Sequence, residues 1–272
     1  MICGFIGCGN MGGAIARSVV QVVGPDQVLL ANRTHEKAER LAQELGCKAV
    51  TNAQAAQCDF LFLGVKPHLM TAVLADLRPH LQLHPNTILV SMAAGLTTQQ
   101  IRDMAGTQQG IIRIMPNTPS SIGAGMIQYC TLDVPAEQQD AFLTIMSKCG
   151  LLDQLPEPLI DAASAVSGSG PAFAYVFMEA LADGGVACGL PRDKALTYAA
   201  QMLLGSAQLL LGSAQLLLSS GSHPGSLKDA VCSPGGSTIQ GIRALEDQAF
   251  RSAVINAVIA TFRRNQEMGR NA

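Results

Sequence analysis

The chain has 272 residues, of which 48% are hydrophobic, 14% charged and 4% aromatic, and its formal net charge is −2. This composition excludes a disordered chain, and the charge gives no sign of a nucleic-acid-binding protein. Charged residues are scarce beside the roughly 25% of an average soluble domain, which favours a surface partly covered by another copy of the chain.

The spacing of cysteine and histidine predicts neither disulfides nor a metal site. The eight cysteines form no CxxC pair, and several lie in apolar runs, which indicates small buried side chains in a reducing compartment. His80 and His84 are four residues apart, but Pro85 follows and no third ligand is near, so we expect a solvated helix end. We expect no secretory segment at the start of the chain and predict a cytoplasmic protein.

Short apolar runs alternate with helical patterns over residues 1–117. Runs rich in Val, Ile, Leu and Phe predict strands buried on both faces, at Ile2–Gly7, Gln27–Asn32, Asp59–Val65, Thr87–Ala93 and Ile111–Met115. Helices are predicted at Met11–Val22, Glu36–Leu45, His68–Leu77 and Thr98–Met104, with a further helix at Pro135–Cys149 and a short apolar run at Leu151–Leu155. This alternation predicts a doubly wound, mainly parallel sheet of the Rossmann type.

The second half of the chain is almost wholly helical in pattern. Pro171 and Pro191 stand where a first-turn proline opens a helix, and the last helix is predicted from Asp247 to Met268. We therefore predict an α/β nucleotide-binding domain over residues 1–157 and an all-α domain over residues 158–272.

One stretch has the length and composition of a membrane span. Residues 195–227 contain no Asp, Glu, Lys or Arg. Gln201, Gln208 and Gln215 recur at every seventh position, however, so they lie along one side of a helix. We expect this helix to be buried in protein at a subunit interface and not in a membrane.

The sequence GCGNMG at residues 7–12 is a GxGxxG motif between a predicted strand and a predicted helix, which is the context of a dinucleotide-binding turn. Gly7 permits the tight turn, and Gly9 lets the backbone approach a pyrophosphate. The helix N-terminus supplies N–H groups without intrahelical partners and a partial positive charge. The alternative is a glycine-rich turn without a ligand.

The end of the second predicted strand indicates which dinucleotide is bound. Enzymes that use NAD usually carry Asp or Glu there, to accept hydrogen bonds from the ribose 2′-hydroxyl. This chain reads Ala31-Asn32-Arg33-Thr34, whose amide, guanidinium and hydroxyl can all donate to a 2′-phosphate. We predict a preference for NADPH over NADH; the alternative is that Arg33 is a solvated surface charge.

Two loops in the second half place small residues at a predicted helix start. They are SGSGP at residues 167–171 and SPGGST at residues 233–238. Backbone N–H groups at a helix start can bind a carboxylate without a dedicated arginine. A helix-capping turn is the alternative for each loop.

Seven motifs together make the chain resemble the pyrroline-5-carboxylate reductase family. They are GFIGCGNMG (4–12), VKPH (65–68), SMAAG (91–95), MPNTP (115–119), SGSGPA (167–172), ADGGVACGLPR (182–192) and HPGSLKDAVCSPGGST (223–238). The resemblance spans residues 2–267. It implies a Rossmann domain followed by an all-α domain that pairs with a second copy, as a homodimer or as a decamer of five dimers. The implied activity is hydride transfer from NADPH, or less readily NADH, to the C=N bond of 1-pyrroline-5-carboxylate, which yields L-proline and completes proline biosynthesis.

The resemblance also implies site residues. The cofactor-binding positions are Ile6, Gly7, Cys8, Gly9, Asn10 and Met11 at the pyrophosphate, Asn32 and Arg33 at the 2′-phosphate, Asn52 on the adenosine side, and Gly64, Val65, Lys66, Pro67, Met92, Ala93 and Ala94 toward the nicotinamide. The substrate-binding positions are Ser233, Gly236, Ser237 and Thr238 at the carboxylate, with Glu157 as a further candidate. Thr238 is the predicted catalytic residue, because its hydroxyl would hydrogen-bond the ring nitrogen.

One feature departs from the family pattern. The heptapeptide LLGSAQL occurs twice in succession, at residues 203–209 and 210–216, where relatives carry one unit. Seven residues add about 10 Å to a helix and return to within about 20° of the same face. The insertion either extends the helix by two in-phase turns or forms a bulged loop.

The residue types independently favour reduction of an imine. A protonated imine is already electrophilic, so the protein mainly has to orient it, which can supply roughly 7–11 kcal/mol. The main alternative is a β-hydroxyacid dehydrogenase-like NADP oxidoreductase, which uses a buried lysine near the start of a long helix, and this chain has no lysine between Lys148 and Lys194. A non-catalytic NADP(H)-binding regulator would not need the SPGGST loop.

Overall fold

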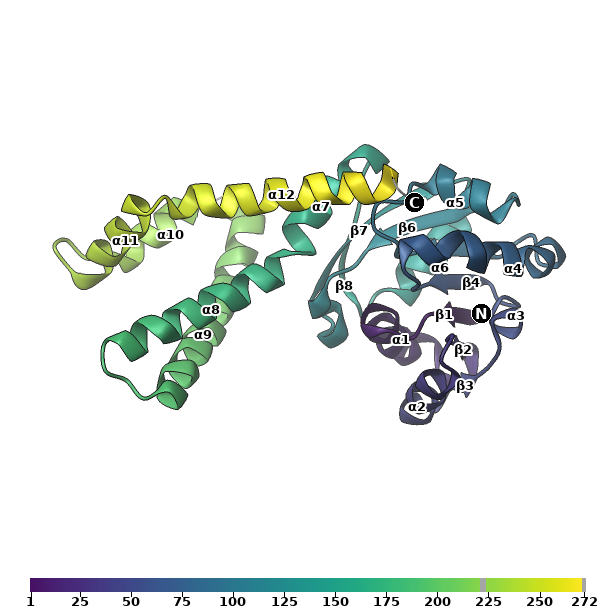
Figure 1. Ribbon diagram of the computed structural model, residues 1–272, viewed down its shortest axis with the longest axis horizontal. Coiled ribbons are helices and arrows are strands. Elements are labelled where there is room, and N and C mark those ends of the chain that lie inside the picture. Colours follow the sequence, from purple (N-terminus) through teal and green to yellow (C-terminus); the bar gives the residue numbers. More distant parts are fainter. Residues whose placement is uncertain (221–223, 271–272) are drawn as a thin grey trace. The chain divides into compact units, whose positions relative to one another are not determined.

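The computed structural model describes residues 1–220 and 224–270 (Figure 1). The chain folds into two compact units, which we call the first and the second unit. The first comprises Met1–Pro171 together with the chain from Ile259 onward, and the second comprises Ala172–Val258. Glu157, at the predicted domain boundary, begins helix α7 (Glu157–Ser167) within the first unit. The boundary itself stays a prediction.

The described part of the first unit is built on an eight-stranded sheet in the order β3-β2-β1-β4-β5-β6-β7-β8. The strands are β1 (Cys3–Ile6), β2 (Val28–Ala31), β3 (Lys48–Ala49), β4 (Phe60–Leu63), β5 (Ile88–Ser91), β6 (Ile111–Met115), β7 (Gly125–Leu132) and β8 (Gly150–Gln154). All neighbouring strands are parallel except β6 and β7, which pair in antiparallel fashion. The expected doubly wound, mainly parallel sheet is confirmed, and the winding direction reverses between β1 and β4.

Helices cover both faces of the sheet (Figure 1). Those on one face are α1 (Asn10–Val23), α2 (His35–Leu45) and α6 (Ala136–Ile145), and those on the other are α3 (Asn52–Ala55), α4 (Met70–Leu83) and α5 (Thr98–Ala105). Successive residues of a central strand point to opposite faces. Phe62 therefore packs in the cluster beneath α1, where its ring stacks on Phe5 with 4.5 Å between centroids, whereas Leu61 and Leu63 pack beneath α4. Burial on both faces is the reason these strands read as unbroken apolar runs.

Two strands and one α-helix in the described part of the first unit were not predicted from the sequence. They are the two-residue strand β3, the single-turn helix α3 and the long strand β7. Polar side chains interrupt the apolar run of β7, and one of them, Gln128, is buried where its Oε1 accepts a hydrogen bond of 3.0 Å from the hydroxyl of Ser167. A polar residue of this kind is stable inside the protein only because of a partner that lies far along the chain.

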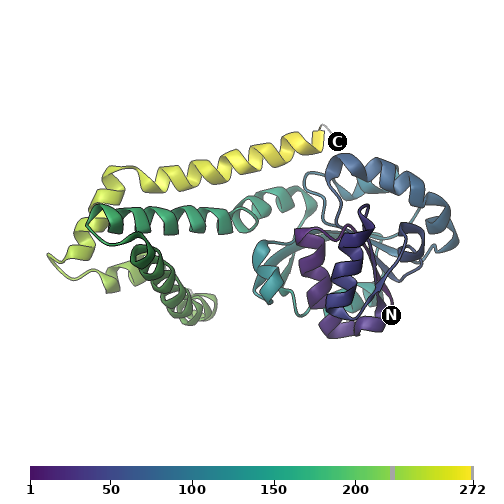
Figure 2. The same cartoon turned by 60° about the horizontal axis from the view of Figure 1, so that its bottom comes forward.

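The residues that the structure describes from Gly170 onward are mainly helical (Figure 2). The helices are α8 (Gly170–Ala187), α9 (Arg192–Ser220), α10 (Pro224–Val231), α11 (Ser237–Asp247) and α12 (Phe250–Arg270). The expectation of an all-α second half is confirmed. Helix α12 begins in the second unit and ends in the first.

The duplicated heptapeptide lies within α9, which runs through both copies as one helix. Of the two outcomes considered for the insertion, the structure therefore shows the helical extension and not the bulge. The side chains of Gln208 and Gln215, on which the predicted polar stripe depends, lie outside the described residues, as does His223 of the HPG segment.

None of the helices in the described residues is both long and apolar enough to cross a membrane. In the same part of the chain, no three His, Cys, Asp or Glu side chains are grouped so that they could hold a metal ion.

Candidate active site

A cleft of about 490 Å³ opens at the carboxyl ends of β1, β2 and β4 in the first unit. The loops that follow these strands form its floor, and the start of α4 forms one wall. Because the sheet order reverses between β1 and β4, the cleft lies at the topological switch point, where open α/β sheets bind their ligands. Its lining residues are Ile6, Gly7, Gly9, Asn32, Arg33, Thr34, Lys37, Asn52, Gly64, Val65, Lys66, Leu69, Ala72, Val73 and Asp76.

The glycines of the motif after β1 have separate physical roles. Gly7 has φ +100°, and a Cβ there would lie 2.5 Å from the carbonyl oxygen of Gly64. A Cβ at Gly12 would lie 2.0 Å from the carbonyl oxygen of Gly7. Gly7 and Gly12 are therefore required for close packing of the turn, α1 and the end of β4. A Cβ at Gly9 would meet none of the described atoms within 4 Å, so the space above it is open to a ligand.

The N-terminus of α1 faces this open space without a side-chain cap. Its N-cap residue is Gly9, which has no side chain that could accept from the first N–H groups of the helix. Unpaired N–H groups and the positive end of the helix dipole bind phosphate oxygens well. This fits the pyrophosphate of a dinucleotide.

Asn32 joins the glycine turn to the loop after β2. Its Oδ1 accepts a hydrogen bond of 3.1 Å from the backbone N–H of Cys8, and its Nδ2 donates one of 2.9 Å to the carbonyl of Thr34. One Nδ2 hydrogen remains for a ligand. The structure thus gives Asn32 a role in fixing the turn, and its contact with a 2′-phosphate stays a prediction.

Two cations line the cleft beside Asn32. The side chains of Arg33 and Lys37 are both exposed, and neither forms an ion pair with another described residue. Thr34, the N-cap of α2, makes no side-chain bond to that helix, so its hydroxyl is also available to a ligand. A second hollow of about 420 Å³ adjoins the cleft and shares Arg33 and Asn52 with it. Three donors thus stand where the sequence predicted a 2′-phosphate site.

Lys37 was not singled out from the sequence. It lies one helical turn beyond Arg33, and the i, i+4 spacing of two cations at a helix start is a signal that could have found it. Asp76 of α4 also lines the cleft and supplies a carboxylate there.

The residues predicted toward the nicotinamide divide into two groups. Gly64, Val65 and Lys66, which follow β4, line the cleft. Pro67 does not, and it begins a short 3-10 helix at Pro67–Leu69. Met92, Ala93 and Ala94 follow β5 and do not line this cleft. Met92 is held beside the end of β4, because its N–H donates a bond of 3.2 Å to the carbonyl of Leu63.

Three predicted pyrophosphate residues, Cys8, Asn10 and Met11, also do not line the cleft through their side chains. The Cys8 thiol points into the protein and donates to the carbonyl of Ala31 at 3.4 Å. Burial raises the pKa of this thiol to about 11, so it stays protonated at neutral pH. Cys8 thus contributes its backbone to the turn, and its raised pKa makes the thiol a weak nucleophile at neutral pH.

The carboxylate of Glu157 is engaged within the first unit. Its Oε1 accepts a bond of 2.7 Å from the N–H of Thr98 and its Oε2 one of 2.9 Å from the Thr98 hydroxyl. Oε1 also lies 3.5 Å from Nη1 of Arg113, whose side chain is 1% exposed and also pairs with Asp161. This network holds the start of α5 against α7, and the substrate-binding role of Glu157 stays a prediction.

The SPGGST loop belongs to the second unit and leads into α11. It turns tightly: the N–H of Gly236 donates a bond of 3.0 Å to the carbonyl of Ser233, and Gly235 has φ +69°. Gly236 is the N-cap of α11 and offers no side-chain acceptor. The exposed side chains of Ser237 and Thr238 have no hydrogen-bond partner among the described residues. Free N–H groups and two hydroxyls at one helix start suit a carboxylate.

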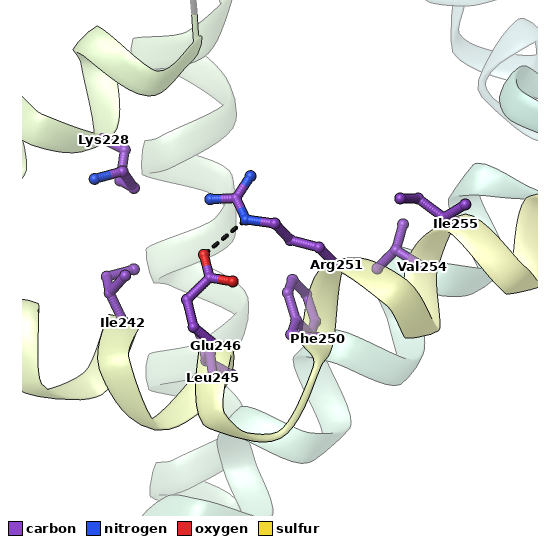
Figure 3. Close-up of a pocket in the computed structure, with 8 residues that line it drawn as sticks. All are labelled: Lys228, Ile242, Leu245, Glu246, Phe250, Arg251, Val254 and Ile255. Atoms are coloured by element: carbon purple, nitrogen blue, oxygen red, sulfur yellow. Dashed lines mark hydrogen bonds and ion pairs between the residues drawn. The ribbon is translucent and has the colours of Figure 1, made fainter.

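The second unit also carries a mainly apolar hollow of about 420 Å³ (Figure 3). Leu245 and Phe250 are among its apolar lining residues, and an ion pair of 2.6 Å between Arg251 and Glu246 crosses it. Large apolar side chains are also exposed elsewhere in this unit, as at Tyr175. Such a surface is typical of a protein–protein interface.

Two family models match the chain. The one described as pyrroline-5-carboxylate reductase dimerisation matches residues 157–268, and the one described as NADP oxidoreductase coenzyme F420-dependent matches residues 2–95.

Individual proteins match the chain over almost its full length. The chain is 38% identical to the pyrroline-5-carboxylate reductase of Escherichia coli (strain K12), with 98% of both chains covered, and 36% identical to that of Arabidopsis thaliana, with 98% of this chain and 95% of the relative covered. Among solved structures, a pyrroline carboxylate reductase of Plasmodium falciparum with NADP bound matches with a TM-score of 0.84 and 30% identity, over 99% of this chain and 98% of that one.

Proposed function

The chain belongs to the pyrroline-5-carboxylate reductase family, and we propose that it reduces the C=N bond of 1-pyrroline-5-carboxylate with NADPH to give L-proline, in proline biosynthesis. The observation that carries the proposal is the likeness to these reductases over almost the whole length of both chains, including the SPGGST loop. The alternative dehydrogenase class gains no support, because α7 and α8 carry no lysine.

The residues of the cleft fit NADPH. The N–H groups at the start of α1 bind the pyrophosphate, while Gly9 leaves room for it to approach. Arg33, Lys37 and Thr34 bind the 2′-phosphate, with Arg33 able to do so through two N–H groups. Asn52 lies on the adenosine side, and the residues after β4 and β5 lie toward the nicotinamide. The bound cofactor supplies the hydride.

The SPGGST loop holds the substrate. The backbone N–H groups at the start of α11 and the hydroxyls of Ser233 and Ser237 bind the carboxylate, and the hydroxyl of Thr238 hydrogen-bonds the ring nitrogen. The substrate nitrogen is protonated in the reactive imine and basic in the product. No strong acid is needed, so a neutral hydroxyl that orients the ring suffices.

The second unit pairs with a second copy of the chain. The match to a dimerisation family model and the exposed apolar side chains of this unit support a homodimer. Five such dimers would form a decamer, which a solution mass measurement distinguishes from a dimer. Free cysteines, several of them buried, support a cytoplasmic location.

The activity is tested by mixing the protein with 1-pyrroline-5-carboxylate and NADPH and following the absorbance of the reduced nicotinamide. We expect oxidation of NADPH that depends on the imine, and none when a β-hydroxyacid is offered with NADP⁺. Turnover of the hydroxyacid without turnover of the imine would reject the proposal in favour of the dehydrogenase class.

The role of Thr238 is tested separately. Thr238→Ala is expected to lower kcat/KM for the imine about tenfold, the usual worth of one hydrogen bond, and to leave the Kd for NADPH unchanged. Thr238→Ser should keep most of the activity, and Thr197→Ala, which removes a hydroxyl that bonds only to its own helix, serves as the control. An equal loss of NADPH binding would show that Thr238 does not contact the substrate.

A further inference from the structure

The last turn of α12 lies against the loop that follows β5, within the first unit. The two segments meet at a pair of glycines, Gly95 and Gly269. A Cβ at Gly95 would lie 2.6 Å from the backbone nitrogen of Gly269, and a Cβ at Gly269 would lie 2.0 Å from the carbonyl oxygen of Gly95. The contact is therefore backbone against backbone, with no room for a side chain on either partner.

Hydrogen bonds fix this contact on both sides. Gln100 donates from Nε2 to the carbonyl of Gly269 at 3.1 Å while its Oε1 accepts from the N–H of Thr97 at 2.8 Å. Gln100 thus ties the start of α5 to the end of α12. Asn265, which is buried, donates from Nδ2 to the carbonyl of Asp161 at 3.4 Å.

The loop between Met92 and Thr97 is anchored at its two ends as well. At one end, the N–H of Met92 donates to the carbonyl of Leu63 in β4. At the other end, the N–H of Thr98 donates to the carboxylate of Glu157, which also pairs with the buried Arg113. Between these anchors, the N–H of Ala93 donates a bond of 3.2 Å to the hydroxyl of Ser91 and the side chain of Leu96 is buried in the core, whereas Gly95 lies against α12. Gly95 itself has φ +80°, a conformation that glycine adopts without strain.

We propose that the last turn of α12, from Asn265 to Gly269, is a positioning element for the loop at residues 92–97. This inference rests on the proposed function, which places Met92–Ala94 toward the nicotinamide. The helix end presses on Gly95 and so sets the position of the preceding three residues. Because misplacement by about 1 Å can cost roughly 100-fold in rate, a positioning element acts on kcat. The phosphate-binding residues, which belong to other loops, are untouched.

The test compares two substitutions on the same helix end. Gly269→Val places a side chain into the contact with Gly95, whereas Gln266→Val puts the same side chain on an exposed position. In ligand-free protein, amide hydrogen exchange over residues 93–98 is expected to be at least tenfold faster in Gly269→Val and unchanged in Gln266→Val. With NADPH and the imine, Gly269→Val should lower kcat 10- to 100-fold and raise the primary isotope effect from deuterated NADPH. Its Kd for NADPH should stay within twofold.

The proposal is overturned if folded Gly269→Val matches Gln266→Val in both exchange and kcat. Should Gly269→Val fail to fold, Gln100→Glu decides, since it removes the donor to the carbonyl of Gly269, keeps the acceptor for the N–H of Thr97 and removes no backbone contact. It is expected to show the same pattern at about threefold, and unchanged exchange with unchanged kcat would overturn the proposal. If the unsubstituted chain does not reduce the imine, the proposed function fails, while the exchange measurement still tests whether α12 positions the loop.

Discussion

Arg33 and Lys37 place two positive charges on one wall of the cofactor cleft, beside the hydroxyl of Thr34. In the described part of the chain neither cation is paired with a carboxylate. Unpaired cations next to a nucleotide site attract a phosphate dianion, and they give the ribose 2′-hydroxyl of NADH no acceptor. We therefore expect selectivity between the two nucleotides to depend on a few side chains at the end of β2.

Arg33→Glu tests this selectivity. The substitution removes a charge-assisted hydrogen bond and adds a repelling carboxylate, so the KM for NADPH should rise roughly 100-fold, while that for NADH changes by less than about threefold. Steady-state kinetics with each nucleotide measure both constants. Arg40→Glu makes the same charge change on the exposed side of α2, outside the cleft, and should alter neither constant. Equal rises for NADPH and NADH in Arg33→Glu would contradict the 2′-phosphate assignment.

Buried thiols give the first unit a pH dependence on the alkaline side. Burial, with a smaller contribution from Asp59, raises the pKa of Cys3 from 9.0 to about 12, and burial raises that of Cys58 to about 12. Between pH 9 and about pH 12, these thiols are deprotonated in the unfolded chain but still protonated in the folded protein. The thiols therefore stabilise the fold fully below about pH 9, and this contribution is lost as the pH rises toward 12.

We expect the free energy of unfolding to fall above pH 9 by up to about 1.4 kcal/mol per pH unit for each such thiol. Urea titrations between pH 7 and pH 10.5 measure the slope. Cys58→Ala should make the slope shallower, whereas Cys188→Ala, which removes an exposed thiol, should leave it unchanged. The same slope in Cys58→Ala as in the unsubstituted protein would show that burial of this thiol does not contribute.

At the scale of the elements, α9 absorbs a seven-residue duplication as continuous helix. The geometry permits this because seven residues rotate a helix by almost two full turns. Residues on either side of the insert therefore keep the same face, although they move apart along the axis by about 10 Å. A helix that accepts such an insert should also accept its removal.

Deleting residues 210–216 is expected to leave the protein soluble and dimeric, because the remaining residues of α9 stay within about 20° of their original face. Size-exclusion chromatography with light scattering measures the assembly. Deleting residues 210–214 is the matched control: five residues rotate the rest of the helix by about 140°, which should disrupt the dimer. Loss of soluble protein in the seven-residue deletion would show that the duplicated copy has become a structural requirement.

The elements that could be predicted from the sequence are those with a local cause. Unbroken apolar runs predict the central strands, and the glycine turn is recognisable because its strand, turn and helix are consecutive in the sequence. Strand β7 could not be predicted, since Gln128 is buried against a partner from α7. The predicted end of α4 at Leu77 was too early: the helix continues through Pro79 to Leu83, because Leu77 and Leu81 are both buried against the core.

The candidate site shows the same division. Gly7 and Gly9 are found from their spacing alone. That Asn32 bonds to Cys8 depends on β1 and β2 lying side by side, and that Glu157 binds Thr98 depends on the approach of α7 to α5. Contacts of this kind are set by tertiary packing, so residue type and spacing could nominate these residues but could not assign their partners.

At the scale of the whole molecule, the low content of charged residues agrees with the many apolar side chains exposed on the second unit. Tyr175, Val176 and Ile255 are exposed by 66%, 65% and 58% although their side chains are large and apolar. A lone protein seldom leaves so many such groups in water. A two-fold dimer would cover these side chains, because the same surface of each subunit then packs against that of the other.

Ile255→Glu tests this arrangement. A carboxylate placed in an apolar interface must be desolvated without a partner, which costs several kcal/mol and shifts the protein from dimer toward monomer. Light scattering after size-exclusion chromatography should therefore give about half the mass of the unsubstituted protein at low micromolar concentration. Leu83→Glu introduces the same charge at an exposed apolar position of the first unit and should leave the mass unchanged. If Ile255→Glu has the same mass as the unsubstituted protein, the dimer interface does not include this face of α12.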